Sequence, residues 1–265
     1  MPREDAPDAA AAANPDMSLL YLDESQNQAF DYEYHSEDEL TDKLAFLQRT
    51  FPKGPRSILD IGGGNGHFLD RLLSEFPEAE GWIVDISPQL LALNETNPRK
   101  HILQGSVERL AQILGGQKFD VISLNWLLHH LVDITYDRSV RNIEKAVELA
   151  ATFLTERGIL MIAENEYQGF FETNVPSHVI YAVTRVQNPV FVKLAGKFFN
   201  TAGVGVCFQS KAAWWKLFRR LGFHVEHYHN YPRWDFPLIK RLAFVGLFLR
   251  AQDHGHFALR RPGVA

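Results

Sequence analysis

The stretch 58–66, ILDIGGGNG, constrains the fold more than any other part of the chain. Its apolar residues Ile58, Leu59 and Ile61 predict a buried strand, and the glycines that follow permit a tight turn with positive φ and a close backbone approach to a ligand. The apolar spacing over 67–75 then predicts a helix. A strand, a glycine-rich turn and a helix in this order are typical of nucleotide-binding α/β proteins.

The spacing of the glycines distinguishes two kinds of nucleotide. Dinucleotide-binding folds use G-x-G-x-x-G, which counted from Gly62 would require a third glycine at position 67. The chain has His67 there, and Gly62, Gly64 and Gly66 form G-x-G-x-G instead. The spacing therefore disfavours a dinucleotide.

Acidic residues at the ends of the first two predicted strands complete the pattern. Asp60 precedes the turn, and Asp85 ends the strand 81–85, where one carboxylate can accept hydrogen bonds from both hydroxyls of a ribose. With the later strand 119–124, these features resemble the class I S-adenosylmethionine-dependent methyltransferases of small molecules. The resemblance covers roughly residues 55–165 and implies S-adenosylmethionine as cofactor.

The resemblance also implies roles for single residues of the cofactor site. Asp60 and the glycine turn would face the methionine part, Asp85 the ribose, and Ile86 the adenine. Ser106 stands where the family usually has an acid that meets the adenine amino group; a serine oxygen can accept that bond less strongly, and Glu108 is near enough to substitute. The predicted cofactor-binding residues are Asp60, Gly62, Gly64, Gly66, Asp85, Ile86, Ser106, Val107 and Asn125.

Two adjacent histidines follow the fourth predicted strand, in the stretch 125–133, NWLLHHLVD. Methyl transfer needs a positioned nucleophile and, where that nucleophile carries a proton, a base, for which a pKa near 6.5 is suitable. The stretch resembles the segment of small-molecule O-methyltransferases that carries a catalytic histidine, with His129 at the base position and His130 where that subgroup has an acid. His129 as base, His130 as base, and neither as base stay open. Asp133 and Glu164 are the candidate orienting carboxylates.

Alternating strands and helices predict a doubly wound α/β fold with a seven-stranded, mostly parallel sheet. The resemblance implies that its last two strands form an antiparallel edge hairpin. The predicted strands are 57–61, 81–85, 101–104, 119–124, 158–163, 223–231 and 242–252, and the predicted helices are 37–51, 67–75, 88–95, 107–114, 138–154 and 210–221. The expected divisions are a disordered tail (1–17), an N-terminal helical cap (18–54), a cofactor-binding core (55–166), a substrate lid (167–208) and a completion of the sheet (209–265).

The composition fits one large core, since the chain has 265 residues and is 46% hydrophobic. The longest apolar run near the end, 242–249, is too short to span a bilayer, and the acidic start does not look like a secretory signal. The single Cys207 cannot form an internal disulfide. These observations predict a cytoplasmic protein with no membrane span.

The net charge of −5 hides an asymmetry, because residues 185–265 carry 13 Lys and Arg against three Asp and Glu. These basic residues are scattered among apolar ones, and no RNA-binding signature accompanies them. The pattern favours internal charge balance and disfavours a nucleic-acid partner. We expect a small-molecule acceptor, whose anionic or aromatic character stays open; the sequence does not predict an oligomeric state.

Several histidines gather near the carboxyl end of the chain. His227 and His229 share one face of a predicted strand, whereas His224 points the other way, and His254 and His256 lie further along. A zinc site normally needs three or four suitably placed ligands, and no cysteine pair contributes here. The sequence therefore predicts no metal site.

The predicted function is transfer of the methyl group of S-adenosylmethionine to a small molecule, at oxygen, in specialised metabolism. Nitrogen and carbon acceptors stay open, although no Asn-Pro-Pro-Tyr motif follows the fourth strand, which disfavours exocyclic amines of bases. Two alternatives remain. One is a nucleic-acid methyltransferase guided by the basic last third, and the other is a cofactor-binding, pericyclase-like enzyme that transfers no methyl group.

Overall fold

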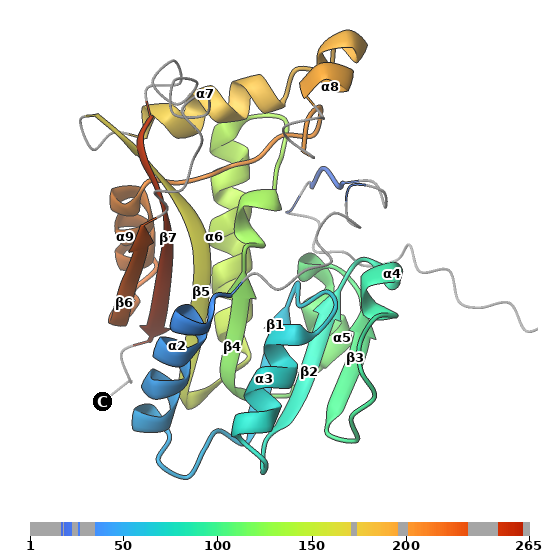
Figure 1. The fold of residues 1–265 in the computed structure, drawn as a ribbon, viewed down its shortest axis with the longest axis vertical. Helices are drawn as coiled ribbons and strands as arrows, with labels where there is room; N and C mark the ends of the chain where they lie inside the picture. The colour runs from blue at the N-terminus through green and yellow to red at the C-terminus, as the bar shows by residue number, and fades with distance from the viewer. Residues whose placement is uncertain are drawn as a thin grey trace, which may run out of the picture.

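Seven strands form a single sheet with helices on both faces (Figure 1). The computed structural model describes residues 17, 19–22, 26, 35–170, 174–195, 201–232 and 249–261. The strands are β1 (Ser57–Ile61), β2 (Glu80–Asp85), β3 (Lys100–Gln104), β4 (Phe119–Asn125), β5 (Leu154–Gly169), β6 (His224–Pro232) and β7 (Leu249–Arg260). The helices are α2 (Glu37–Thr50), α3 (His67–Glu75), α4 (Pro88–Leu91), α5 (Leu110–Leu114), α6 (Tyr136–Thr152), α7 (Val175–Thr184), α8 (Pro189–Ala195) and α9 (Lys211–Arg220).

The strand order is β3-β2-β1-β4-β5-β7-β6. Strands β1 to β5 pair in parallel, and β7 lies antiparallel between β5 and β6. The predicted doubly wound sheet with an antiparallel edge hairpin is confirmed. Because parallel strands require crossover connections, the carboxyl ends of β1, β2, β4 and β5 meet at one edge, which is the ligand-binding edge of such sheets.

Each face of the sheet has its own apolar core. Helices α2 and α3 cover one face, where Leu47, Leu69 and Leu72 are fully buried. Helices α5, α6 and α9 cover the other face, where Trp214 and Phe218 are fully buried. Since both faces are covered, the central strands are apolar on both sides and cannot be recognised by alternation.

The N-terminal helix α2 begins at a capping box. The Ser36 hydroxyl accepts from the Glu39 backbone N–H, and the Glu39 carboxylate accepts from the Ser36 N–H. The same carboxylate reaches β7, with 2.9 Å between its Oε1 and Nδ1 of His254. Helix α2 thus lies on the sheet face, and the parts of the predicted cap that reach the pocket described below are residues 19–22 and His35.

Two predicted element bounds were wrong. Strand β5 continues six residues beyond the predicted end at 163, because Glu164 and Glu166 are fully buried and hydrogen-bonded there, although their charge made the segment look like a loop. Helix α4 ends at Leu91 instead of continuing to 95, and the side chain of Asn94 bonds backbone carbonyls, including that of Leu91 at 3.1 Å.

The last strand was also misplaced. It was expected at 242–252, on the longest apolar run, and β7 instead covers Leu249–Arg260; residues 242–248 lie outside the described part of the chain. His254 and His256, which the sequence placed beyond the strand, are buried within it. The sequence did not indicate this strand, because its buried polar residues have their partners on α2, which is distant in the chain. Most of the expected tail, and 171–173 and 196–200 of the expected lid, also lie outside the described residues.

Helices α7 and α8 lie beyond the carboxyl ends of the parallel strands, at the top of Figure 1. Residues 201–208 return from them towards the sheet, and the backbone N–H of Cys207 donates to the carbonyl of His129 at 2.8 Å. Among the described residues, no helix is long and apolar enough to cross a membrane. The expected lid segment is therefore attached directly to the histidine-bearing turn after β4.

Arg99 offers a test of how α3 is joined to the sheet. Its guanidinium donates to the carbonyls of Leu73, Phe76 and Ala79 at 2.7 to 3.2 Å, where α3 ends. Arg99→Met keeps the aliphatic stem and leaves these carbonyls without their donor, so we expect a loss of about 1 to 3 kcal/mol in the free energy of unfolding. Urea unfolding followed by tryptophan fluorescence measures this loss. Arg109→Met, on the exposed surface, is the control, and an equal loss there would contradict the assignment.

Candidate functional site

A pocket of about 440 Å³ opens at the carboxyl ends of the parallel strands and extends towards α7. This volume lies within the usual range of small-molecule sites. One end is formed by the glycine turn and by the residues that follow β2 and β3. The other end is formed by the turn after β4, by the extension of β5 and by the expected lid segment. Representative lining residues are Gly62, Gly64, Asp85, Ser106, His129, Tyr167 and Phe208.

The glycine turn has the backbone that its sequence predicted. Gly62, Gly64 and Gly66 have φ of +74°, +49° and +81°, a region that favours glycine. A Cβ on Gly66 would lie 1.9 Å from Oδ1 of Asn94. The three spaced glycines therefore satisfy a real backbone constraint; Gly62 and Gly64 line the pocket, whereas Gly66 lies behind its wall.

Asp85 holds this turn in place. Its Oδ2 accepts from the Gly64 N–H at 3.0 Å, and its Oδ1 accepts from the Ser87 N–H at 2.8 Å. Each carboxylate oxygen has a second lone pair, so the side chain can accept further bonds from a diol in the pocket. The position suits both anchoring the turn and binding a ribose.

Asp60 is buried at the end of β1, beside the same turn. Burial raises the pKa of its carboxyl to about 7, although a hydrogen bond from Ser123 Oγ at 2.6 Å and the nearby charge of Lys43 act in the opposite direction. Its Oδ1 also lies 3.5 Å from Nδ2 of Asn125. Asp60 and Asn125 thus share one polar corner of the pocket.

The predicted adenine-binding residues line one side of the pocket. Ile86, Ser106 and Val107 are all in its wall, and Glu108 adjoins them. The Glu108 carboxylate accepts from the hydroxyl of Tyr21 through one oxygen. Its other oxygen, Oε2, is buried and has no hydrogen-bond partner among the described residues. Glu108 is therefore better placed than Ser106 to accept from an amino group of a ligand.

The chain bends sharply after β4. Trp126 has φ +49° and is the one non-glycine residue of the described chain with positive φ. Such a conformation costs on the order of 1 to 3 kcal/mol and is most often found at functional sites. The bend leads into the 3₁₀ turn Leu128–His130, and it places both histidines in the pocket wall.

His129 is held by a buried carboxylate. Its Nδ1 lies 2.6 Å from Oε2 of Glu164, and Oε1 of Glu164 accepts from the backbone N–H of Leu128 at 2.7 Å. Of the two candidate orienting acids, Glu164 makes this contact, whereas Asp133 bonds Arg138 at 3.1 Å. Because Nδ1 is engaged, Nε2 is the nitrogen of His129 that can exchange a proton with a ligand.

His130 differs electrostatically from its neighbour. Its ring lies 4.1 Å from that of His129, between centroids, and both rings line the pocket. Burial, with a smaller contribution from His129, lowers the pKa of His130 well below its usual value. His130 is therefore a neutral and weak base at pH 7.

The far end of the pocket is apolar and partly aromatic. The Phe208 ring stacks on His129 at 4.6 Å and lies 4.5 Å from the ring of Tyr167. The charged residues among the described lining are all acidic and lie at the end with the glycine turn; none of these described residues is Lys or Arg. The remaining apolar wall includes Ile180, Val183, Val206 and Leu249.

The sequence missed the contribution of α2 to this site. The Nζ of Lys43 donates to Oδ1 of Asn125 at 3.1 Å and lies 4.9 Å from the centre of the Phe68 ring. A signal was available, since Lys43 lies on the same helix face as the buried Leu40 and Leu47. A charged residue in an apolar stripe indicates a buried polar partner elsewhere in the chain.

Residues 59–160 match the family described as a methyltransferase domain. These residues form a methyltransferase domain. The match begins in β1 and ends in β5, so it contains the glycine turn, Asp85 and both histidines. The predicted family is confirmed.

Two relatives and one solved structure illustrate the similarity of the chain to methyltransferases. An O-methyltransferase of Aspergillus oryzae is 31% identical over 94 residues, which are 30% of this chain and 21% of the relative. A 23S rRNA (guanine(748)-N(1))-methyltransferase of Streptomyces fradiae is 41% identical over 63 residues, 23% of this chain and 22% of the relative. The chain thus matches less than a third of the length of these relatives. A solved methyltransferase of Geobacter sulfurreducens, in complex with S-adenosylhomocysteine, has a TM-score of 0.53 at 18% identity and covers 89% of this chain and 96% of its own, which supports the fold.

The cofactor of this class of methyltransferase domain is S-adenosylmethionine, as the sequence predicted. Three features of the pocket fit it. Gly62, Gly63 and Gly64 line the pocket, Asp85 can accept from a diol, and the buried Oε2 of Glu108 has no hydrogen-bond partner among the described residues.

The raised pKa of Asp60 predicts how stability depends on pH. The folded protein retains a proton up to about pH 7 that the unfolded chain releases near pH 4, so the contribution of Asp60 to stability falls as the pH rises through this range. Asp60→Asn cannot ionise. We expect the free energy of unfolding of the native protein, relative to this variant, to fall by on the order of 2 to 3 kcal/mol between pH 5 and pH 8.

Urea unfolding of the cofactor-free protein at several pH values measures this difference. Asp137→Asn, an exposed position in the first turn of α6, is the control. A difference between native protein and Asp60→Asn that stays constant from pH 5 to pH 8 would show that Asp60 is ionised throughout.

Proposed function

We propose that the protein transfers the methyl group of S-adenosylmethionine to an oxygen atom of a small apolar or aromatic molecule, with His129 as general base. S-Adenosylmethionine supplies an electrophilic methyl group on a sulfonium centre. The observation that carries the proposal is the His129–Glu164 pair: His129 stands in the pocket wall, and the buried Glu164 holds its ring from behind. O-methyltransferases among the relatives support the oxygen target.

The proposed base is held in one tautomer. Glu164 accepts from Nδ1–H of His129 and so leaves Nε2 free to take the proton of an acceptor hydroxyl. As His129 becomes charged, the adjacent carboxylate stabilises the imidazolium. Stacking of Phe208 on the ring keeps the imidazole in this orientation. The chain thereby contributes positioning and a proton acceptor, which are the two tasks that methyl transfer requires.

The cofactor residues are proposed from their places in the pocket. The glycine turn and Asp60 would bind the methionine part, Asp85 the ribose, and Ile86 would pack on the adenine. Glu108 would accept from the adenine amino group through its buried oxygen, with Ser106 and Val107 beside it. Asn125, which accepts from Lys43, would connect this half of the site to α2.

The acceptor class follows from the chemistry of the far end. The described lining there is mainly apolar and aromatic, with Asn165, Thr184, Thr201 and Gln252 as uncharged polar members, and it offers no Lys or Arg to a carboxylate or phosphate. We therefore favour an aromatic or apolar acceptor over an anionic one. Helix α7 and residues 201–208 would act as the lid that excludes water from the reacting atoms.

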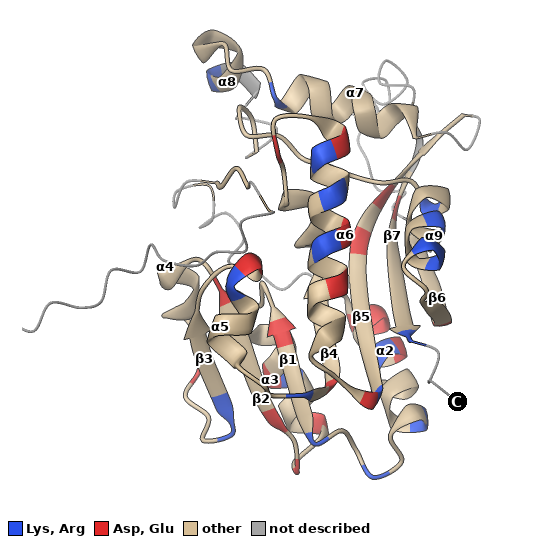
Figure 2. Cartoon of the chain, turned by 180° about the vertical axis from the view of Figure 1, so that it is seen from behind, with Lys and Arg blue, Asp and Glu red and all other residues tan. Residues whose placement is uncertain are grey.

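The nucleic-acid alternative receives little support from the charge distribution. Figure 2 shows Lys and Arg positions on α9 and both basic and acidic positions on α6. Arg220 of α9 pairs with Glu144 of α6, and Arg260 of β7 lies 3.1 Å from Glu226 of β6. These pairs support internal charge balance as the role of the basic last third.

His129→Ala tests the base directly. Loss of the proton acceptor should lower kcat by roughly 10² to 10⁴ while the affinity for S-adenosylhomocysteine stays unchanged. Glu164→Gln should lower kcat less and change the pH profile, because the amide cannot stabilise the imidazolium. Release of S-adenosylhomocysteine with a panel of phenols and neutral hydroxylated compounds gives the rates, and His101→Ala on β3 is the control.

Near-normal turnover of His129→Ala would exclude His129 as the base, and the enzyme would then act by positioning the acceptor and the cofactor alone. If the native protein binds S-adenosylhomocysteine but gives no methylated product with any acceptor, the non-methylating alternative is favoured instead. Binding to RNA that weakens steeply with salt would support a nucleic-acid acceptor.

Asp85→Ala tests the ribose assignment. Removing the acceptor should weaken binding of S-adenosylhomocysteine by about 1 to 3 kcal/mol, measured by calorimetry. Because Asp85 also anchors Gly64, the loss is compared with that for an analogue that lacks one ribose hydroxyl. If Asp85 binds the ribose, the variant discriminates less between the two ligands than the native protein does. Equal discrimination would confine Asp85 to holding the turn.

A further inference from the structure

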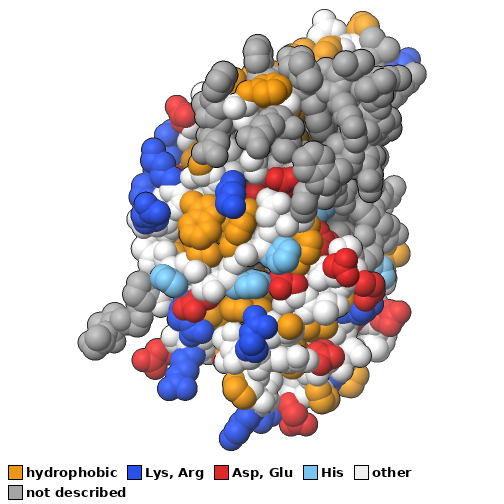
Figure 3. Space-filling model, turned by 60° about the vertical axis from the view of Figure 1, so that its left-hand side comes forward, with side chains coloured by type: hydrophobic (Ala, Val, Ile, Leu, Met, Phe, Trp, Pro, Cys, Tyr) orange, Lys and Arg blue, Asp and Glu red, His pale blue; other side chains and the backbone are white. Residues whose placement is uncertain are grey.

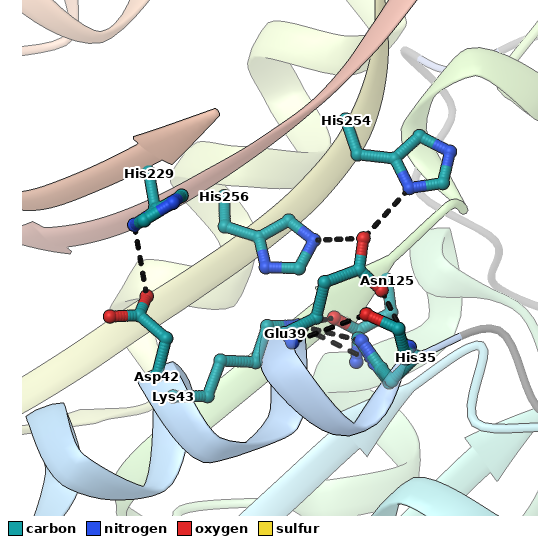
Figure 4. Close-up of polar contacts among 9 residues, drawn as sticks. His35, Glu39, Asp42, Lys43, Asn125, His229, His254 and His256 are labelled. Atoms are coloured by element: carbon teal, nitrogen blue, oxygen red, sulfur yellow. Dashed lines mark hydrogen bonds and ion pairs between the residues drawn. The ribbon is translucent and has the colours of Figure 1, made fainter. Parts of the chain in front are cut away.

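Histidine side chains gather where α2 packs against the β6–β7 hairpin. Figure 3 shows imidazoles beside acidic side chains on this face, and Figure 4 shows the contacts beneath them. His229 and His256 are partners on neighbouring strands, and α2 directs Glu39 and Asp42 towards them. Two groups of potential metal ligands result: an inner one of His35, Glu39 and His256, and an outer one of Asp42, His227 and His229.

We propose that the outer group, Asp42, His227 and His229, binds a divalent transition-metal ion such as zinc and thereby fastens α2 to β6. This site is separate from the pocket and does not depend on the function proposed above. Two imidazoles and a carboxylate are ligands that zinc accepts, with a fourth position left to water or another group.

The donor atoms converge on a common point. Oδ2 of Asp42 lies 2.8 Å from Nε2 of His227 and 3.9 Å from Nδ1 of His229, and all three donor atoms lie within 4.8 Å of one another. Donors at about 2.0 to 2.2 Å from a tetrahedral ion are separated by roughly 3.3 to 3.6 Å, so shifts of about 1 Å complete the site. A hydrogen bond explains the contact with His227 but not the approach of His229, which is too distant for one.

Aromatic neighbours fix both rings. Phe46 stacks on His227 at 5.2 Å, and Tyr231 stacks on His229 at 4.2 Å, each with an interplanar angle of 20°. The two histidines share a face because they are two residues apart on a strand. Ligands that are oriented before the ion arrives lose little conformational freedom on binding it.

The surroundings suit an exchangeable cation. The side chains of Asp42, His227 and His229 are 23%, 26% and 48% exposed, which gives an ion access and leaves room for water as a fourth ligand. Asp42 follows the acidic first turn of α2, which carries Glu37, Asp38 and Glu39. A divalent cation would reduce this local excess of carboxylate charge.

The inner group is less suitable, although it is more buried. The Nζ of Lys43 lies 3.3 and 3.4 Å from the two ring nitrogens of His35, so an ammonium group already occupies the place beside these ligands. Glu39 is also engaged by His254 at 2.9 Å (Figure 4). Charge repulsion from Lys43 therefore favours the outer group.

An ion at the outer site would reach the pocket through α2. The same helix carries Lys43, which donates to Asn125 at the end of β4, and it starts next to His35, which lines the pocket. A metal bound only by the folded protein stabilises it, and the stabilisation increases with the logarithm of metal concentration over Kd. Binding at Asp42 would thus hold α2, and with it the contact from Lys43 to Asn125, in place without entering the reaction.

The test uses the full chain, freed of metal with a chelating resin. Titration with Zn²⁺ by calorimetry, and competition with a chromophoric chelator, should show one bound equivalent and a rise in Tm. His229→Ala and Asp42→Asn should each weaken binding by at least about tenfold and abolish the rise in Tm. His224→Ala is the matched control, because it lies on the same strand with a side chain that is 72% exposed, and it should behave as the native protein does.

Three outcomes would overturn the proposal. One is the absence of a Zn²⁺-dependent heat or change in Tm in the native protein. Another is unchanged Zn²⁺ affinity in Asp42→Asn together with a lower Tm of its metal-free form, which would reduce the contact to an ion pair. The third is loss of binding in His256→Gln but not in His229→Ala, which would place the ion at the inner group. The Tm of each metal-free variant shows whether it folds.

Discussion

The buried carboxylate of Glu164 is the constraint on which the reactive part of the structure depends. Burying an ionised group costs several kcal/mol unless its oxygens are paired. Glu164 is fully buried, and its partners are two backbone N–H groups after β4 and the imidazole of His129. These contacts join β5 to the turn that follows β4. The extension of the sheet and the orientation of the histidine are therefore consequences of the same interaction.

Similar pairs of buried polar groups connect the edges of the sheet to the covering segments. Lys100 of β3 binds Asp70 of α3 at 2.8 Å, and Glu39 of α2 meets His254 of β7. In contrast, the centre of the sheet is held by apolar packing that is tolerant of which side chain fills it. Specific polar contacts are thus concentrated where the position of a segment matters for the pocket.

Local patterns predicted the parts of the structure that local interactions determine. The glycine turn and the bounds of α3 followed from adjacent residues, because the φ preference of glycine and the apolar spacing of a helix act within one or two turns. The bounds of β5 and β7 did not. Their buried charges are paired with residues that lie 35 positions away for Glu164 and 215 positions away for His254. A single sequence shows the unexpected charge in such a segment but not the partner that makes it tolerable.

The site is divided in a similar way: the residues on the methyl-donor side lie within the family match, and those on the acceptor side lie beyond it. The family match ends at residue 160, so it includes the turn and Asp85, which are proposed to bind the cofactor. Tyr167, Phe208 and the residues of α7, which form the apolar end, come from chain beyond that match. Surface segments that are attached to a core, such as this lid and the N-terminal segment, can change in sequence without disturbing the buried contacts of the glycine turn. The residues proposed to meet the acceptor therefore lie beyond the matched segment, and α2, held to the hairpin by Glu39 and Asp42, supports the pocket from outside its lining.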